Sequence, residues 1–312
     1  MKKSLYTVPY KKQIRLFIDT DANCEADDDY AIIHALMTPK AEVKGIIAGH
    51  YGGKTSGEME KSYQEIIRIC MLGGYDPCLA LKGAKGPMKN EREILESEGV
   101  FALIAEAMSE DKRPLFVICQ GALSNIASAI LKQPEICGKM ILIIVGGIHY
   151  PAGGYEFNTM NDRHAFNVVM KSAVPCWVLP EEVYSTMQAG MAELYHRLFD
   201  CGDLGRYLVE RTRKTVDTML HVIPDTSMEA PYDYAVGFPN GESWSLGDSC
   251  GIGVLISHNC GRFREVRAPY INPDGSYLVS EQAKKVRWYS DVNSRFILED
   301  FFYKMKYYFE RR

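Results

Sequence analysis

The chain has 312 residues, 46% of them hydrophobic, and a net charge of -4, so it can bury a large core. The slight acidity and the absence of long basic runs argue against a nucleic-acid partner. No apolar segment follows the basic start of the chain, and no run reaches the roughly 18 residues that a membrane span needs. We therefore expect a cytoplasmic protein that binds neither nucleic acid nor membrane.

The first 180 residues alternate short apolar runs, typical of buried strands, with segments of helical spacing. Strands are expected at 14–18, 43–48, near Leu79, 115–119, 140–145 and 176–179, and helices at 28–37, 58–72, 91–108, 123–131 and 162–170. This alternation indicates an α/β fold with a doubly wound, mostly parallel sheet and helices on both faces. Ligands bind such sheets at the carboxyl ends of the strands, so functional residues are expected there.

The character of the sequence changes after residue 180. We expect helices at 183–199, 203–220, 248–257 and 294–312, an aromatic lid loop at 223–244, and a hairpin in which strands 262–268 and 277–279 flank Asn272-Pro-Asp-Gly275. No linker or repeat marks a boundary. We therefore expect residues 1–312 to form one domain, in which 14–180 are the core β/α units and 181–312 elaborate them.

Nine cysteines are scattered along the chain without a CxxC pair, and several lie in apolar runs. This distribution favours buried free thiols over a disulfide framework or a thiolate metal site.

The stretch that follows the first strand is unusually acidic, with six carboxylates in the eleven residues 19–29. So many like charges repel one another unless a cation binds them. An EF-hand fails, because Cys24 stands where its glycine belongs and Tyr30 where its glutamate belongs. An aspartyl-phosphate phosphatase would employ Asp19 and Asp21 but leave the acidic residues at 27–28 without a role. Helix capping needs only one carboxylate.

The segment Ile18-Asp-Thr-Asp21 to Asp27-Asp28 resembles the amino-terminal signature of the inosine–uridine-preferring nucleoside hydrolase superfamily. The commonest form of that signature has Pro-Gly-x after the second aspartate. Here the longer Ala22-Asn-Cys-Glu-Ala26 replaces it, so the chain resembles a divergent member.

Further segments match the superfamily in the same order along the chain. They are Gly121-Ala-Leu-Ser-Asn-Ile-Ala127, Val145-Gly-Gly147, Glu156-Phe-Asn158 with Asn161-Asp162, and Gly247-Asp248. Together the matches span about residues 14–260.

The resemblance implies a Ca²⁺ site, and oxygen ligands suit this ion. The implied metal ligands are Asp21, Asp28, Asp248 and the backbone carbonyl of Ser124. In this scheme Asp21 also takes a proton from the metal-bound water that attacks the anomeric carbon, and the surrounding negative charge stabilises an oxocarbenium-like transition state. The implied sugar contacts are Asp27, His50, Glu156 and Asn158. Asp19 would support the loop, whereas Glu25 and Asp29 receive no role.

One departure from the superfamily concerns the leaving group. Purine-cleaving members have a histidine just before the last metal aspartate, and here that position is Gly247. Either another residue protonates the base or the leaving group differs. His149 and several aromatic residues are further candidates for the pocket, namely Tyr184, Tyr232, Tyr234 and Trp244.

We therefore expect a calcium-dependent N-ribosyl hydrolase that cleaves a nucleoside, or a related ribosyl compound, to base and ribose. A catalytically quiet calcium- and ribose-binding protein and a hydrolase of another glycosyl bond remain as alternatives. The superfamily precedent favours a homodimer or homotetramer. The base preference does not follow from the sequence.

Overall fold

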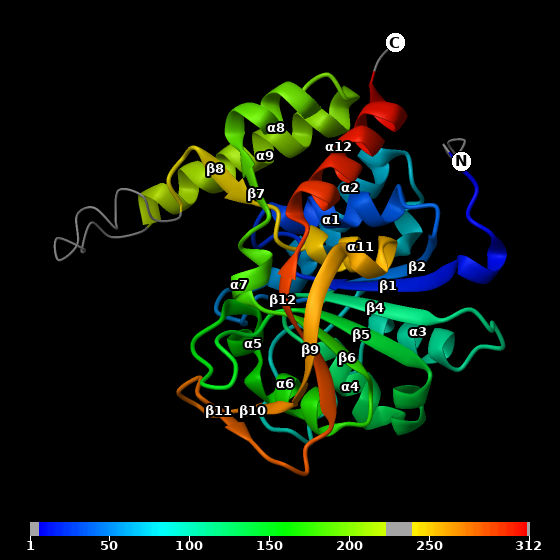
Figure 1. The fold of residues 1–312 in the computed structure, drawn as a ribbon, viewed down its shortest axis with the longest axis vertical. Helices are drawn as coiled ribbons and strands as arrows, with labels where there is room; N and C mark the ends of the chain where they lie inside the picture. Colours follow the sequence, from blue (N-terminus) through cyan, green and yellow to red (C-terminus); the bar gives the residue numbers. More distant parts are fainter. Residues whose placement is uncertain (1–5, 223–238, 311–312) are drawn as a thin grey trace.

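The computed structural model describes residues 6–222 and 239–310, and its centre is a twisted sheet (Figure 1). Within the described residues the sheet has eight strands in the order β3-β2-β1-β4-β5-β6-β12-β9. Their bounds are β1 Ile14–Thr20, β2 Ala41–Ala48, β3 Ala80–Lys82, β4 Leu115–Gln120, β5 Met140–Val145, β6 Cys176–Leu179, β9 Gly261–Arg267 and β12 Lys285–Val292. Neighbouring strands run parallel, except that β9 is antiparallel to β12.

Helices cover both faces of the sheet (Figure 1). One face carries α1 Asp27–Leu36, α2 Glu58–Gly73, α8 Met191–Leu198, α9 Gly202–Val222, α11 Ser249–Ile256 and α12 Ser294–Phe309. The other carries α3 Glu98–Ala107, α4 Ser124–Lys132, α5 Phe157–Asn161 and α6 Arg163–Lys171. Strand β1 serves both cores, because Leu16 and Ile18 pack into the first and Phe17 into the second.

Shorter elements complete the described chain. They are α7 Glu181–Tyr184, the antiparallel pair β7 Gln188–Gly190 and β8 Ser243–Ser245, the hairpin β10 Pro269–Ile271 and β11 Tyr277–Val279, and 3₁₀ turns at Tyr10–Lys12, Pro77–Leu79, Pro134–Gly138 and His258–Cys260.

The strand order reverses direction at β1. The chain runs from β1 outward through β2 to β3, and then returns to place β4 on the other side of β1. The carboxyl ends of β1 and β4 lie side by side, with Thr20 opposite Gln120. A crevice at such a switch point is where open α/β sheets bind ligands.

The predicted fold class is confirmed, and the six predicted strands are present in the sheet. The prediction missed β12, which adds to β6 and continues the sheet. It also paired 262–268 with the wrong strand. That segment forms β9 and pairs with β12, whereas the Asn272–Gly275 turn joins β10 to β11. The turn signal was right, but long-range pairing decides which strands use it.

Two predicted helices differ from the observed ones. The helix expected from residue 91 begins at Glu98, because the Ser97 side chain accepts a hydrogen bond from Val100 N and caps it there. The helix expected at 183–199 is interrupted, because Gln188–Gly190 pairs as β7 with β8. Tertiary pairing overrides the local helical spacing in the second case.

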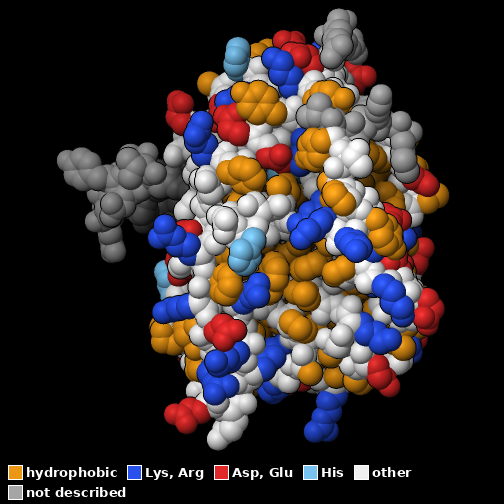
Figure 2. All heavy atoms as spheres, turned by 45° about the vertical axis from the view of Figure 1, so that its right-hand side comes forward, with side chains coloured by type: hydrophobic (Ala, Val, Ile, Leu, Met, Phe, Trp, Pro, Cys, Tyr) orange, Lys and Arg blue, Asp and Glu red, His pale blue; other side chains and the backbone are white. Residues whose placement is uncertain are grey.

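Most of the predicted lid loop, 223–238, lies outside the described residues. No helix in the described part of the chain is long and apolar enough to cross a membrane. The cysteines are free thiols, as predicted, and all but Cys24 and Cys78 are buried. Figure 2 shows one face of the molecule, where basic and acidic side chains are interspersed around a group of apolar ones.

Candidate functional site

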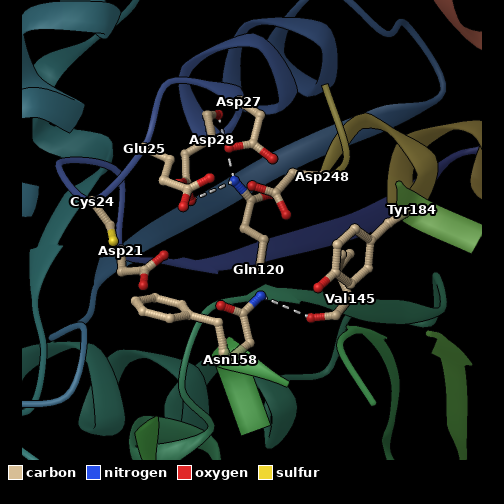
Figure 3. A pocket seen from close by; sticks show the side chains of 11 residues that line it. Asp21, Cys24, Glu25, Asp27, Asp28, Gln120, Val145, Asn158, Tyr184 and Asp248 are labelled. Atoms are coloured by element: carbon tan, nitrogen blue, oxygen red, sulfur yellow. Dashed lines mark hydrogen bonds between the residues drawn. The ribbon is translucent and has the colours of Figure 1, made fainter. Parts of the chain in front are cut away.

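A pocket opens at the switch point of the sheet, and acidic side chains dominate its lining (Figure 3). It encloses about 440 Å³ of space, which includes its open mouth. Its lining residues are Asp21, Cys24, Glu25, Asp27, Asp28, Gln120, Val145, Phe157, Asn158, Tyr184 and Asp248. They come from the loop after β1, the start of α1, the ends of β4 and β5, and the segments around α5, α7 and α11.

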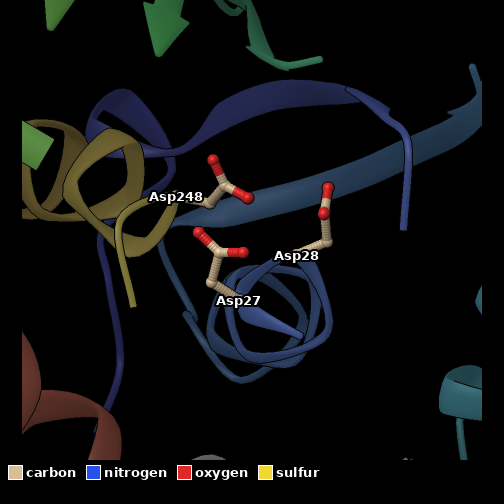
Figure 4. Close-up of side chains that lie close together, drawn as sticks. All are labelled: Asp27, Asp28 and Asp248. Carbon is tan, nitrogen blue, oxygen red and sulfur yellow. The ribbon is translucent and has the colours of Figure 1, made fainter. Parts of the chain in front are cut away.

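Three of these carboxylates form a compact cluster at the ends of two helices (Figure 4). One oxygen each from Asp27, Asp28 and Asp248 lies within 4.8 Å of the other two. Asp27 and Asp28 occupy the first turn of α1, and Asp248 precedes the first residue of α11. The partial positive charge of a helix amino terminus favours carboxylates at both places.

Asp28 is held in a fixed orientation by the sheet beneath it. Its Oδ1 accepts hydrogen bonds from Thr20 Oγ1, at the end of β1, and from Gln120 Nε2, at 3.1 Å, at the end of β4. Gln120 stands at a strand end, where functional residues were expected, although the sequence assigned it no role. These bonds engage one oxygen of Asp28 and orient the carboxylate.

The pKa values of the clustered carboxyl groups are raised. Burial, followed by the negative charges of Asp28, Glu25 and Asp27, raises the pKa of Asp21 well above its ordinary value. Burial and neighbouring carboxylates act in the same direction on Asp27 and Asp248. Burial raises the pKa of Glu25 to about 7 and that of Asp28 to about 6. A bound cation would relieve the electrostatic repulsion between these carboxylates.

The donor set fits a hard divalent cation. Carboxylate oxygens at this mutual spacing are the ligands that Ca²⁺ and Mg²⁺ prefer. Asp21 Oδ2 is buried and has no hydrogen-bond partner among the described residues, so this oxygen is available to a ligand. The geometric cluster contains Asp27 rather than Asp21, although both line the pocket.

Asp19 lies behind the pocket. Asn125 Nδ2, in α4, donates to Asp19 Oδ1 at 2.8 Å, and Asn125 Oδ1 accepts from Ala84 N. Burial raises the pKa of Asp19 to about 7, although the Asn125 hydrogen bond opposes this shift. The carboxyl group of Asp19 therefore ties the end of β1 to α4.

The acidic loop is anchored from outside by Arg211 of α9. Arg211 Nε donates to Asp29 Oδ2 at 2.9 Å, and Nη2 donates to the backbone oxygens of Ala22 and Glu25. Sequence reasoning gave no role to Asp29 and missed Arg211, because nothing near Arg211 in the chain marks it. The structure gives Asp29 an anchoring contact and turns the Glu25 side chain into the pocket.

Ser124 and His50 lie in a buried network beside the pocket rather than in its lining. His50 Nδ1 accepts from Gly52 N, so Nε2 donates to Ser124 Oγ at 2.7 Å, and Ser124 Oγ donates to Asp162 Oδ2 at 2.6 Å. The backbone carbonyl of Ser124 accepts from Ser128 Oγ at 2.8 Å.

Glu156 and Asn158 lie close in the sequence but in different environments. Asn158 lines the pocket, and its Nδ2 donates to the Val145 carbonyl at 3.1 Å (Figure 3). Glu156 is buried behind it and caps α5 by accepting from Asn158 N and Thr159 N. Tyr184 joins the two regions, because it lines the pocket and donates to Glu156 Oε1 at 3.0 Å.

Gly247 fits closely between two pocket residues. A Cβ atom at this position would lie 3.1 Å from Tyr184 Cδ2 and 3.3 Å from Asp27 Oδ2. A side chain here would therefore require Tyr184 to shift.

Other sequence-based candidates lie elsewhere. His149 is largely exposed and contacts Glu182. Trp244 is buried and does not line the pocket. Tyr232 and Tyr234 lie outside the described residues. Phe157, which was not predicted, does line the pocket.

Comparison with known proteins agrees with this architecture. Residues 16–297 match the family model described as inosine-uridine preferring nucleoside hydrolase. The match covers most of the chain and therefore shows the family. The protein belongs to the inosine-uridine preferring nucleoside hydrolase family, as the resemblance predicted.

The relatives are distant. The chain is 24% identical over 266 residues to the pyrimidine-specific ribonucleoside hydrolase RihA of Salmonella paratyphi A, which covers 77% of this chain and 79% of that protein. The structure of a purine-preferring ribonucleoside hydrolase from Gardnerella vaginalis superposes with a TM-score of 0.71 at 18% identity, covering 94% of this chain and 98% of the other. An inosine-uridine preferring nucleoside hydrolase from Bacillus anthracis gives a TM-score of 0.64 at 13% identity, covering 94% and 99%.

Proposed function

We propose that this protein is a calcium-dependent N-ribosyl hydrolase that cleaves a nucleoside, or a closely related ribosyl compound, to base and ribose. The observation that carries the proposal is the cluster of Asp27, Asp28 and Asp248 at the switch point, beside the unpartnered oxygen of Asp21. Family membership supplies the reaction class.

The proposed ligands of the ion are Asp21, Asp28, Asp248 and the carbonyl of Ser124. All-oxygen coordination and several carboxylates favour Ca²⁺ over softer metals. Asp27 lies in the same cluster and would bind a sugar hydroxyl next to the metal. The Ser124 carbonyl oxygen already accepts a hydrogen bond from Ser128 Oγ. A carbonyl oxygen has two lone pairs, and the proposed metal contact would be made by the lone pair that this bond does not use.

The chemistry follows from where the carboxylates lie. A bound calcium ion would supply Lewis-acid stabilisation and lower the pKa of a coordinated water. Asp21 would accept the proton of the attacking water as general base. Positive charge that develops on the ribosyl ring would be stabilised by the carboxylates around it, including Glu25.

Asn158 is the proposed sugar contact on the opposite wall. His50 and Glu156 are also assigned to the sugar by their positions in the motifs. Their side-chain polar atoms are engaged within the protein, so a direct contact would exchange an internal hydrogen bond for one to the sugar.

The test is a reducing-sugar assay over purine and pyrimidine nucleosides with added calcium. Relatives described as pyrimidine-specific and as purine-preferring make both base classes necessary. We expect release of ribose from at least one nucleoside, and loss of this activity with chelator or in Asp21→Asn. Asp203→Asn, on the exposed start of α9, is the matched control and should retain activity. Turnover that survives chelation would refute calcium dependence.

A second candidate is a protein that binds calcium and ribose without turnover. Gly247 favours it, because the position just before Asp248 carries no imidazole that could protonate a leaving base. Calcium-dependent binding of a nucleoside in calorimetry, with no sugar released from any member of the panel, would support this candidate over the enzyme.

A further inference from the structure

Tyr184 is the aromatic residue at the end of α7 that lines the pocket beside Asp248 (Figure 3). Its ring packs against Gly247, where an added Cβ would approach both Tyr184 and Asp27. The ring therefore lies near the metal-binding carboxylates. The glycine is what leaves space for it.

Glu156 fixes the hydroxyl group of Tyr184. Tyr184 Oη donates to Glu156 Oε1 at 3.0 Å, and a carboxylate can only accept. The hydroxyl hydrogen of Tyr184 is therefore directed away from the pocket, and its oxygen lone pairs remain for a ligand.

Glu156 itself is already saturated within the described structure. Besides Tyr184, its Oε1 accepts from Asn158 N at 3.1 Å, and its Oε2 accepts from Gly147 N at 3.0 Å, Thr159 N at 3.0 Å and Thr159 Oγ1 at 2.8 Å. An ionised carboxylate offers about four lone-pair sites. Glu156 is buried and does not line the pocket, so as long as these internal hydrogen bonds are kept it acts on a ligand through Tyr184.

Asn158 offers a further acceptor on the same wall as Tyr184. One hydrogen of its Nδ2 is donated to the Val145 carbonyl at 3.1 Å, which leaves Oδ1 as an acceptor and the second hydrogen of Nδ2 as a donor. Tyr184 Oη and Asn158 Oδ1 are therefore two acceptors on the wall opposite the clustered carboxylates. A ligand hydroxyl seated there can donate to either oxygen.

We propose that Tyr184 is a specificity-determining residue that accepts a hydrogen bond from a hydroxyl of the ribosyl unit, and that Glu156 is the positioning residue that orients it. The inference rests on the proposed function for the identity of the ligand. It assigns Tyr184 to binding and not to protonation of the leaving base, because the hydroxyl hydrogen of Tyr184 is donated to Glu156 Oε1, outside the pocket lining.

The test compares Tyr184→Phe with the wild type on inosine and uridine and on their 2′-, 3′- and 5′-deoxy forms. Loss of one hydrogen bond should raise KM by about five- to tenfold. The value of kcat and its pH profile should stay unchanged. The penalty should vanish for the one deoxy analogue that lacks the hydroxyl bound by Tyr184.

Two further variants sharpen the result. Tyr277→Phe removes another largely buried hydroxyl, which accepts from Ile148 N at 3.0 Å in the same loop region but does not line the pocket. It should leave KM unchanged. Glu156→Gln should raise KM, and adding Tyr184→Phe to it should cause no further increase, because both act through one contact. Thermal unfolding checks that each variant folds.

The outcomes separate this inference from the proposed function. If Tyr184→Phe lowers kcat at constant KM, Tyr184 acts as a proton donor and the inference is overturned. If the kinetics of Tyr184→Phe are unchanged, Tyr184 makes no hydrogen bond to the substrate and the inference is overturned as well. If the wild type hydrolyses nothing, the proposed function fails, and calorimetry with inosine and calcium decides the inference. Weaker binding by Tyr184→Phe supports it, whereas equal binding, or none by the wild type, overturns it.

Discussion

Arg211 Nε lies 2.9 Å from Asp29 Oδ2, and the two residues are 182 positions apart in the chain. The same guanidinium binds the carbonyl oxygens of Ala22 and Glu25, so one side chain of α9 holds both ends of the segment that carries the acidic side chains of the pocket. Burial raises the pKa of Asp28 to about 6, and the charge of Arg211 opposes this rise. The segment is longer than the Pro-Gly form of the motif, and Arg211 contacts it at three points.

We expect Arg211→Met to weaken calcium binding by about 10- to 100-fold, because supporting contacts of this kind tune metal affinity by that range. Isothermal titration calorimetry measures the effect. Arg213→Met is the matched control, since Arg213 lies on the same helix, is 67% exposed and pairs with Asp217. Lower thermal stability with unchanged calcium affinity would show that Arg211 is only structural.

Asp248→Asn should abolish the thermal stabilisation that calcium gives. A ligand that binds only the folded state stabilises it by about 2.7 kcal/mol at a hundred times its Kd, so the melting temperature of the wild type should rise with calcium and fall with chelator. Removal of one clustered carboxylate should remove most of this shift. Asp274→Asn, in the exposed turn between β10 and β11, should keep it. An unchanged shift in Asp248→Asn would exclude this site.

Glu25→Gln should stabilise the metal-free protein at pH 8. The folded-state pKa of Glu25 is raised to about 7 from 4.5, so the ionised side chain opposes folding above pH 7, by roughly 1–3 kcal/mol. The gain should shrink as the pH falls from 7 to 4.5, because Glu25 in the wild type becomes neutral. Urea unfolding at several pH values, with chelator present, measures it. A gain that grows towards low pH would contradict the expected sign.

His34 gives the opposite pH dependence on the far side of α1. Its ring is buried and contacts Asp300 of α12 at 2.8 Å, and burial lowers its pKa from 6.5 to about 4. Burial favours the neutral form of the His34 ring. The contribution of His34 to folding stability is therefore fully present above pH 6.5, and it is lost as the pH falls towards 4. The stability difference between wild type and His34→Gln should therefore decrease over that interval. Parallel curves for the two proteins would refute the assignment.

Much of the fold could be predicted from local pattern. The buried strands of the first 180 residues are continuous apolar runs, and each is followed by helical spacing, so their order and parallel direction followed directly. The error at β9 and the omission of β12 have one cause. Both strands are partly exposed and are not continuous apolar runs, and their pairing with β6 and with each other is set by contacts far apart in the chain.

The residues of the site likewise fall into those that the sequence marked and those that it did not. Asp21, Asp27, Asp28 and Asp248 stand in motifs, and their place after strands or at helix starts was visible in the sequence. Tyr184 was only one of several aromatic candidates. Glu156, which orients it, stands in a motif, whereas no motif marked Arg211, and Gln120 was marked only by its place at a strand end. Gln120 matters because β4 lies beside β1, and Arg211 because α9 packs near the acidic loop.

The sequence by itself determined the family, the α/β class and the chemical character of the site, because these depend on residue types in a fixed order along the chain. Only the tertiary structure decided how each polar group is used. It left an oxygen of Asp21 unpartnered, committed Glu156 to the interior and set Tyr184 in the space beside Gly247. The physical reason is that a buried polar atom must satisfy its hydrogen bonds with whatever neighbours the fold supplies, and those neighbours are distant in sequence.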